Sequence, residues 1–184
     1  KSRQTNQVIG NVKLEKPIDV VFEGVNLDIY KPLKNSELNT FDFTGIKESF
    51  CYLFVGHWMK ADFGHDRKNV SLLVKAFYET FKNKKKQPAL ILKSSTGVAG
   101  YMSRDEILDK IKHIKKSVDG KNLPNVYVLN GEFTDSEMNE LYNNPKVKAM
   151  VSLTKGEGFG RPLLEFTTSG KPVLASGWSG HTDF

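Results

Sequence analysis

The residues best suited to chemistry lie in the run TKGEGFGRPLLE, at positions 154–165. Its glycines leave backbone amides unshielded beside an expected helix N-terminus, where an anion or a sugar hydroxyl can be held. Glu157 and Glu165 flank the glycines with seven residues between them, and carboxylates accept hydrogen bonds from hydroxyl groups. The spacing therefore favours a polyol ligand such as a sugar or a ribose. The structural alternative is a glycine-rich turn in which Glu165 only complements the helix dipole.

A second candidate is GHWMKADFGHDRKN, at positions 56–69, which follows a short apolar run. Arg67 and Lys68 lie where the next helix should begin, and two cations at that place oppose the helix dipole. Such an unfavourable pair suggests a phosphate ligand that the cations share with the backbone amides. The plain alternative is an Arg-Lys pair on the surface.

Signatures of other chemistries are missing from the sequence. None of the four histidines shows a metal-ligand spacing, so we predict no metal site. There is no Walker A motif and no G-x-S-x-G elbow. Trp58 and Trp178 are expected to be packing residues, and Cys51, in an apolar run, is expected to be a buried thiol.

Alternating strands and helices must position the two loops. Five short apolar runs predict strands, namely FCYLFVG, PALILK, NVYVLNG, VKAMVSLT and KPVLAS. Helical signals lie between them: an apolar face in NVSLLVKAFYETF, a capping box at Ser103 and Glu106, a second at Thr134 and Glu137, and Pro162 as a first helical residue. This alternation predicts an α/β fold, a Rossmann-like, doubly wound parallel sheet with helices on both faces.

The predicted domain spans residues 46–184. Residues 1–45 contain short strand-like runs and then a polar stretch without helical period, so they are interpreted as a lead-in or linker. The chain opens on Lys1 rather than Met and stops soon after the fifth predicted strand. We therefore expect truncation at both ends, with the domain incomplete at its C-terminus.

The composition is that of a globular domain. Of the 184 residues, 26% are charged and 39% are hydrophobic, which excludes collagen-like and disordered classes. The net charge is +6, but the lysine clusters lie at expected helix ends and are not interleaved with aromatics. We therefore expect no nucleic-acid partner. No apolar run approaches the roughly 20 residues that a membrane helix needs.

The run VSLTKGEGFGRPLLEFTTSGKPVLASGWSGHTDF resembles the signature of a large family, the retaining, nucleotide-sugar-dependent glycosyltransferases of the GT-B fold (group 1, family 4-like). The matching positions are Glu157-Gly158-Phe159-Gly160, Glu165 and Gly170-Lys171-Pro172-Val173. The stretch from Phe54 and the segment VYVLNGEFTDSEMNELYNNPKVKAMVSL resemble further parts of that family. The resemblance implies that the chain is the second half of a GT-B fold, the donor-binding domain, without its acceptor-binding N-terminal domain.

The resemblance also implies roles for the loop after the first strand. Lys68 matches a lysine that holds the diphosphate of the donor together with an arginine. His57, directly after Gly56, stands in the place of that arginine, and a neutral imidazole cannot clamp phosphate as a guanidinium does. Arg67 is expected to substitute for it from another direction.

Other positions are implied to contact the remaining parts of the donor. Glu157 matches the glutamate that meets the transferred sugar, and Glu165 the one that hydrogen-bonds the ribose. The amides of Gly158, Phe159 and Gly160 match the loop that contacts sugar and phosphate. The base is expected at the exit of the third strand, between Asn130 and Phe133, through backbone contacts.

The implied function is transfer of a sugar, with retention, from a nucleoside-diphosphate sugar to an acceptor. The enzyme is expected to be hexosyltransferase-like, to serve carbohydrate biosynthesis and to be cytoplasmic, with peripheral contact to a membrane left open. Beyond the donor substrate no cofactor is expected, and the acceptor, a glycan, lipid or small molecule, stays open. The alternatives are an epimerase of the GT-B fold and a non-catalytic nucleotide-sugar-binding or scaffold domain, the latter because of His57.

Overall fold

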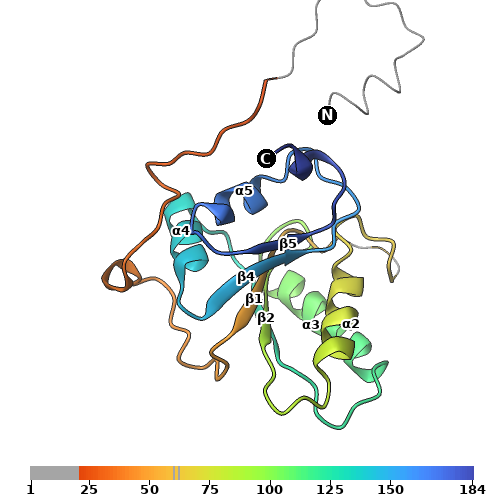
Figure 1. The fold of residues 1–184 in the computed structure, drawn as a ribbon. Coiled ribbons are helices and arrows are strands. Elements are labelled where there is room, and N and C mark those ends of the chain that lie inside the picture. Colours follow the sequence, from red (N-terminus) through yellow and green to blue (C-terminus); the bar gives the residue numbers. More distant parts are fainter. Residues whose placement is uncertain (1–20, 60, 62) are drawn as a thin grey trace, which may run out of the picture.

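The computed structural model describes residues 21–59, 61 and 63–184 (Figure 1). Within them, five parallel strands form one sheet in the order β3-β2-β1-β4-β5. The strands are β1 (Cys51–Val55), β2 (Ala89–Lys93), β3 (Val126–Leu129), β4 (Val147–Ser152) and β5 (Val173–Ala175). All five lie in the runs that predicted them, so the Rossmann-like parallel sheet is confirmed.

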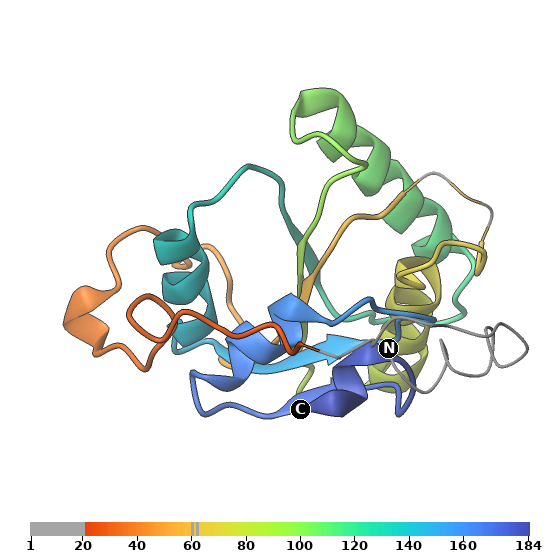
Figure 2. The ribbon, with the colours of Figure 1, turned by 90° about the horizontal axis from the view of Figure 1, so that it is seen from above.

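Helices connect the strands and cover both faces of the sheet, as the sequence predicted. They are α2 (Val70–Phe81), α3 (Tyr101–Lys116), α4 (Asp135–Asn143) and α5 (Arg161–Thr167), with short 3₁₀ turns η1 (Asn35–Glu37) and η2 (Gly180–Asp183). Helices α2 and α3 pack on one face, and α4 and α5 on the other (Figure 2). In the described part of the chain no helix is long and apolar enough to cross a membrane.

Each face of the sheet has its own hydrophobic core, because alternate side chains of a strand point to opposite faces. In β2, Leu90 and Leu92 pack toward α2 and α3, whereas Ile91 packs toward α4 and α5, and all three are fully buried. Burial of each such side chain stabilises the fold by about 1.5–3 kcal/mol. The two cores fix the sheet between its helices and leave the strand ends for the loops.

Three single residues test the sequence interpretation of the core. Cys51 is fully buried, and burial raises the pKa of its thiol to about 11, which agrees with an inert packing residue. Trp58 is buried, as predicted. The prediction is wrong for Trp178, which is 57% exposed on the segment after β5.

The capping box predicted at the start of α4 is confirmed. The Thr134 hydroxyl accepts a hydrogen bond from the backbone N–H of Glu137 at 3.3 Å. The Glu137 carboxylate accepts one in return from the backbone N–H of Thr134 at 2.7 Å. Two donors that the first helical turn leaves free are thereby satisfied.

The capping box predicted at Ser103 is wrong, because the N-cap of α3 is Gly100, three residues earlier, and the helix begins at Tyr101. Ser103 is buried inside the helix, where its hydroxyl accepts hydrogen bonds from the Thr96 N–H and the Asn130 side-chain amide. Tertiary contacts with the loops after β2 and β3 thus use the side chain that the local pattern assigned to capping. By the same kind of shift, Pro162 is the second residue of α5 rather than the first.

The described part of the predicted linker packs along α4 (orange beside teal in Figure 2). Tyr30 is 2% exposed and donates its hydroxyl hydrogen bond to Asp135 at 3.0 Å. Tyr30 and Phe43 both belong to the core cluster on the α4 face. The boundary between residues 45 and 46 stays a prediction, but residues before it contribute to the core.

Glu140 of α4 fastens this segment and makes its attachment sensitive to pH. Its carboxylate accepts hydrogen bonds from the backbone N–H groups of Asn39 and Thr40, at 2.9 Å each, and from the Thr40 hydroxyl at 2.8 Å. Partial burial acts to raise the pKa of Glu140, but these hydrogen bonds outweigh it and lower the pKa below 4.5. A lowered pKa stabilises the fold above the unfolded value, and this contribution is lost as the pH falls through the folded value.

We expect Glu140→Gln to lower the free energy of unfolding by about 1 kcal/mol at neutral pH, because an amide replaces a carboxylate acceptor. The difference from the wild type should shrink as the pH falls below 4.5 toward the lowered pKa of the folded protein, through which the native carboxylate becomes protonated. Urea unfolding at neutral pH and at a pH below 4.5 measures the difference in stability between the variant and the wild type. Glu79→Gln, which removes an exposed partner of Lys82, is the control and should change stability by less than about 0.5 kcal/mol. An equal difference at both pH values would contradict the assignment.

Candidate functional site

The loops that follow β1 and β4 meet at the carboxyl edge of the sheet, because these two strands are direct neighbours. The backbone N–H of Lys155 donates to the carbonyl of Arg67 at 3.0 Å, and the hydroxyl of Thr154 donates to the same carbonyl at 3.4 Å. The two segments that the sequence singled out are therefore joined through their backbones. Ligands of doubly wound sheets bind at this edge.

Three predicted site residues lie together where these loops meet. Lys68 Nζ is 2.5 Å from Glu157 Oε1, and Arg67 Nη1 is 3.7 Å from Glu157 Oε2. Arg67 also donates a hydrogen bond to the carbonyl of Gly156 at 2.7 Å. The side chains of Lys68 and Glu157 are only 14% and 9% exposed, whereas that of Arg67 is 64% exposed. Lys68 and Glu157 thus form a shielded ion pair, with Arg67 at its open side.

Asp66 holds the turn that presents the two cations, and the sequence analysis missed it. This buried carboxylate accepts hydrogen bonds from the backbone N–H of Val70 at 2.6 Å and from the Ser71 hydroxyl at 2.8 Å. It thereby caps α2, while Asn69, with φ 56°, makes a left-handed turn into the helix. An Asp shortly before a helical pattern is the signal that could have revealed it.

The glycine-rich loop enters α5 at Gly160, a position that has no room for a side chain. Gly160 has φ 92°, and a Cβ atom there would lie 2.6 Å from the Cβ atom of His181. Gly158 meets nothing within 4 Å of such a Cβ position. Phe159 packs on Phe184, with ring centroids 5.3 Å apart. The contacts of Gly160 and Phe159 therefore help to anchor the loop, and there is free space beside the Cα atom of Gly158.

Glu165 is buried on the α4 side of the loop, 6% exposed. Its carboxylate accepts hydrogen bonds from Arg161 Nε at 2.8 Å and from the Tyr142 hydroxyl at 3.3 Å. Burial raises the pKa of Glu165, and Arg161 acts in the opposite direction. These partners belong to α4 and α5, so the structure does not join Glu165 to the cluster around Lys68. Two of the roughly four lone-pair sites of the carboxylate remain for a ligand.

Gly56 and His57 lie directly after β1. His57 Nδ1 is 2.9 Å from the Ser95 hydroxyl, so the imidazole is tied to the loop after β2. The backbone N–H of Gly56 donates to the carbonyl of Lys93 at 3.1 Å. A Cβ atom at Gly56 would lie 3.5 Å from Lys68 Cε. Gly56 therefore packs against the lysine stem, while His57 binds to Ser95.

Asn130 and Phe133 support the loop after β3 from within. The Asn130 side chain accepts from the N–H of Gly100 at 2.8 Å and donates to the Ser94 carbonyl at 3.0 Å and the Ser103 hydroxyl at 3.1 Å. The ring of Phe133 packs on Phe41 and lies 4.8 Å from the Lys93 ammonium group. Since both side chains are engaged, a ligand at this exit would meet the backbone, as the resemblance implies.

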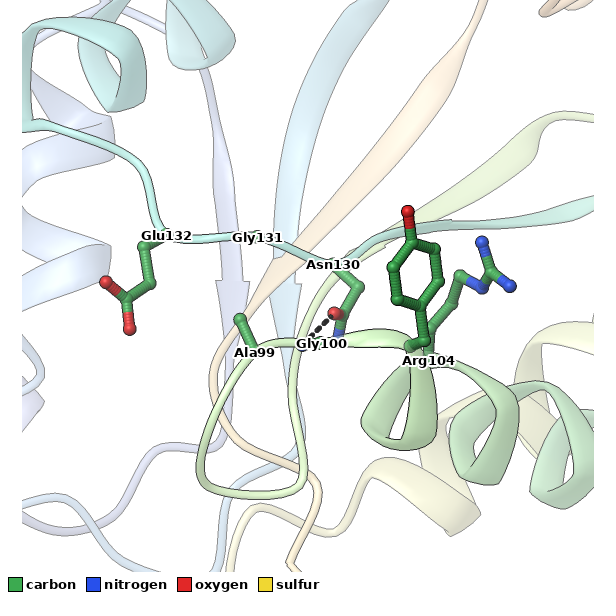
Figure 3. A pocket seen from close by; sticks show the side chains of 7 residues that line it. Ala99, Gly100, Arg104, Asn130, Gly131 and Glu132 are labelled. Carbon is green, nitrogen blue, oxygen red and sulfur yellow. Dashed lines mark hydrogen bonds between the residues drawn. The ribbon is translucent and has the colours of Figure 1, made fainter.

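A cavity of about 400 Å³ opens beside this exit (Figure 3). It is lined by Ala99, Gly100, Tyr101, Arg104, Asn130, Gly131 and Glu132. Tyr101 is 79% exposed, and the guanidinium carbon of Arg104 lies 5.2 Å from its ring centroid. Such an exposed ring, backed by a cation, can stack on a planar ligand. The sequence analysis missed both residues, because it took Ser103 as the N-cap of the helix and assigned no role to Tyr101 or Arg104.

Unsatisfied polar groups gather at the same edge of the sheet. Among the described residues, three buried side-chain atoms have no hydrogen-bond partner: Asn69 Oδ1, Ser94 Oγ and His181 Nδ1. They follow β1, β2 and β5, respectively. Unsatisfied buried groups are rare and call for an explanation, and functional edges are where they occur. In residues 21–59, 61 and 63–184, no three His, Cys, Asp or Glu side chains form a group that could hold a metal ion.

Comparison with known proteins shows the family of the chain and agrees with its fold. Residues 59–184 match the family described as Glycosyl transferases group 1. Among solved structures, the chain is similar to the C-terminal domain of a glycosyl transferase group 1 family protein (LpcC) from Francisella tularensis, with a TM-score of 0.57. The two share 16% sequence identity over 84% of this chain and 71% of that chain, a likeness that shows the fold. No curated protein matches the chain.

We expect Lys68 and Glu157 to be energetically coupled, because their shielded ion pair is screened little by water. A double-mutant cycle of Lys68→Met and Glu157→Gln, measured by urea unfolding, should give a coupling of about 1–3 kcal/mol. The exposed pair Arg104–Asp105, with side chains 47% and 64% exposed, is the control and should give less than about 1 kcal/mol. A coupling free energy between Lys68 and Glu157 no larger than that of the control pair would show that the ion pair does not stabilise the fold.

Proposed function

Because this chain belongs to the group 1 glycosyl transferases, we propose that it binds the donor, a nucleoside-diphosphate sugar, in a hexosyltransferase-like enzyme that retains the configuration of the transferred sugar. The observation that carries the proposal is the meeting of Lys68 and Arg67 with Glu157 at the edge of the glycine-rich loop. Two cations suit a diphosphate, and the carboxylate suits sugar hydroxyls.

On this proposal, the diphosphate binds at Lys68 and Arg67. Two cations that precede α2 oppose its dipole, and in the structure Glu157 supplies the compensating negative charge. A diphosphate brought to Lys68 would take over that compensation. The Glu157 carboxylate would then be released from the ammonium group and could accept hydrogen bonds from the sugar.

The remaining parts of the donor fit along the same edge. The ribose would bind the free lone pairs of Glu165, which Arg161 and Tyr142 hold in place. The base would lie in the cavity after β3, against the backbone of Gly131 and beside the ring of Tyr101. A donor in this orientation extends from β3 to β4, with its sugar at Glu157.

The chemistry assigned to these residues is stabilisation of the leaving nucleoside diphosphate. Charge develops on the leaving phosphate, and Lys68, Arg67 and the amides of residues 158–160 are the groups that would balance it. His57, at the position of the family arginine, is hydrogen-bonded to the Ser95 hydroxyl. Arg67 is therefore assigned the role of that arginine. Glu157 orients the sugar and does not attack it. The acceptor is expected to be presented by an N-terminal domain, and its class stays open.

We expect UDP, GDP or ADP to bind this chain, and calorimetric titration with the three nucleotides measures it. Lys68→Ala should weaken the binding about tenfold or more, because a charge-assisted hydrogen bond to phosphate is lost. Glu157→Gln should strengthen it several-fold, because the variant removes a negative charge beside the phosphates. The control Lys75→Ala removes a cation of α2 that lies over Phe63 and should have no effect. Absence of binding by all three nucleotides at millimolar concentration would contradict the donor assignment.

In the enzyme that includes the acceptor-binding domain, we expect the two glutamates to act on different kinetic constants. Glu165→Gln should mainly raise the KM of the donor, because ribose contacts exist in ground state and transition state alike. Glu157→Gln should mainly lower kcat, because it orients the group whose bonding changes. Lys68→Ala should cost about 2–4 kcal/mol of transition-state stabilisation.

Steady-state assays with a panel of nucleotide sugars, read by mass spectrometry, measure these constants, and NMR of the product gives the anomeric configuration. The exposed Glu79→Gln serves as the control for a charge change elsewhere on the fold. If correctly folded Lys68, Glu157 and Glu165 variants all keep the wild-type kcat/KM, the proposed site is wrong. An inverted product would overturn retention alone.

A further inference from the structure

Ser179 adopts a backbone conformation that is costly for any residue with a side chain. It has φ 84° and ψ −168° and lies directly before η2, on the segment that follows β5. This region of backbone space is essentially reserved for glycine. Such strain persists only where surrounding contacts impose it, and it concentrates at functional sites.

The contacts that impose this conformation lead to Glu157. The Ser179 hydroxyl accepts a hydrogen bond from the backbone N–H of Glu157 at 3.0 Å and donates one to the backbone carbonyl of Glu157 at 2.8 Å. The N–H of Gly180 donates to the same carbonyl at 3.2 Å. Both backbone polar groups of Glu157 are thus held by a residue 22 positions further along the chain.

The segment of Ser179 is pressed against the glycine-rich loop at close range. A Cβ atom on Gly180 would lie 2.1 Å from the carbonyl oxygen of Gly158, so only glycine permits this approach. On the other side, His181 donates from Nε2 to the carbonyl of Ser176 at 2.5 Å and packs on Gly160. These close contacts fix the segment after β5 against the glycine-rich loop, and they place the Ser179 hydroxyl at the backbone of Glu157.

The fold alone does not explain why this residue is serine. If the turn were the only requirement, glycine would adopt the conformation without strain. Alanine would keep the strain and make neither hydrogen bond. Serine keeps the strained turn and in exchange supplies the hydroxyl that binds both backbone groups of Glu157.

We propose that Ser179 is a positioning residue for Glu157: its hydroxyl fixes the backbone of Glu157 so that the carboxylate lies at Lys68 and meets the transferred sugar. The second part rests on the proposed function. Because the Ser179 hydroxyl acts through Glu157 and bonds to its backbone rather than to Lys68 or Arg67, its loss should weaken recognition of the sugar and should not weaken recognition of the diphosphate.

Three variants of the chain test the proposal. Ser179→Gly removes the hydroxyl and the strain, and Ser179→Ala removes the hydroxyl alone. The matched control, Thr182→Val, removes a neighbouring hydrogen bond from the Thr182 hydroxyl to the Ser179 carbonyl and leaves Glu157 untouched. The measurements are the hydrogen-exchange rate of the Glu157 amide, the thermal unfolding temperature, and the affinities for GDP, GDP-mannose, UDP and UDP-glucose.

We expect the Glu157 amide to exchange at least about tenfold faster in both Ser179 variants, because its acceptor is lost. Ser179→Gly should unfold at a higher temperature than Ser179→Ala, because it relieves the strained conformation. The affinity gained on adding the hexose to the nucleotide should fall by about five- to tenfold in both variants. Nucleotide affinity alone should fall by no more than about twofold, and Thr182→Val should match the wild type in the exchange rate and in all affinities.

The outcomes separate this inference from the proposed function. An unchanged exchange rate at Glu157 would overturn the positioning role. Faster exchange with equal losses of nucleotide and nucleotide-sugar affinity would reduce Ser179 to a structural residue and overturn it as well. If the wild-type chain binds the nucleotide but gains nothing from the hexose, the sugar role of Glu157 fails, while the exchange rate still decides whether Ser179 positions its backbone.

Discussion

The parallel pairing of β1 with β4 is the constraint on which the site depends. These strands are separated along the chain by two other strands and three helices, yet Tyr52 lies opposite Ala149 and Leu53 opposite Met150. Parallel neighbours end at the same edge of a sheet. The loops after β1 and β4 therefore lie side by side, and every contact between Lys68 and Glu157 follows from that adjacency.

A compensation of charge is built on this adjacency. Capping by Asp66 begins α2 just after two cations, a place where the helix dipole disfavours them. Glu157, delivered from the neighbouring strand, offsets one of these charges in a largely shielded position. The same cations could instead face a diphosphate. The loop thus presents two cations at a helix N-terminus, and an anionic ligand bound there would offset their charge as Glu157 does.

The carboxyl edge is held rigid from several sides. Asn130 joins the loops after β2 and β3 to the start of α3, and Ser179 joins the segment after β5 to Glu157. Both side chains support the loops of the candidate site through hydrogen bonds within the protein, and this role requires no contact with a ligand. Rigid support of this kind keeps reacting groups within the small tolerances that recognition and catalysis require.

The sequence by itself determined the strand runs, the alternation of strands and helices, the capping box at Thr134 and the two loops that form the candidate site, because these depend on local periodicity and spacing. Two of its failures share one physical reason, namely that a tertiary contact takes a side chain for which the local pattern predicted another role. Ser103 binds the neighbouring loops rather than capping α3, and Phe43 enters the core from a polar segment that has no helical period. Only the tertiary structure decided that Glu165 is engaged by α4 and α5 while Glu157 pairs with Lys68. Two carboxylates in one motif are alike in sequence, and the elements packed around each one set their different surroundings.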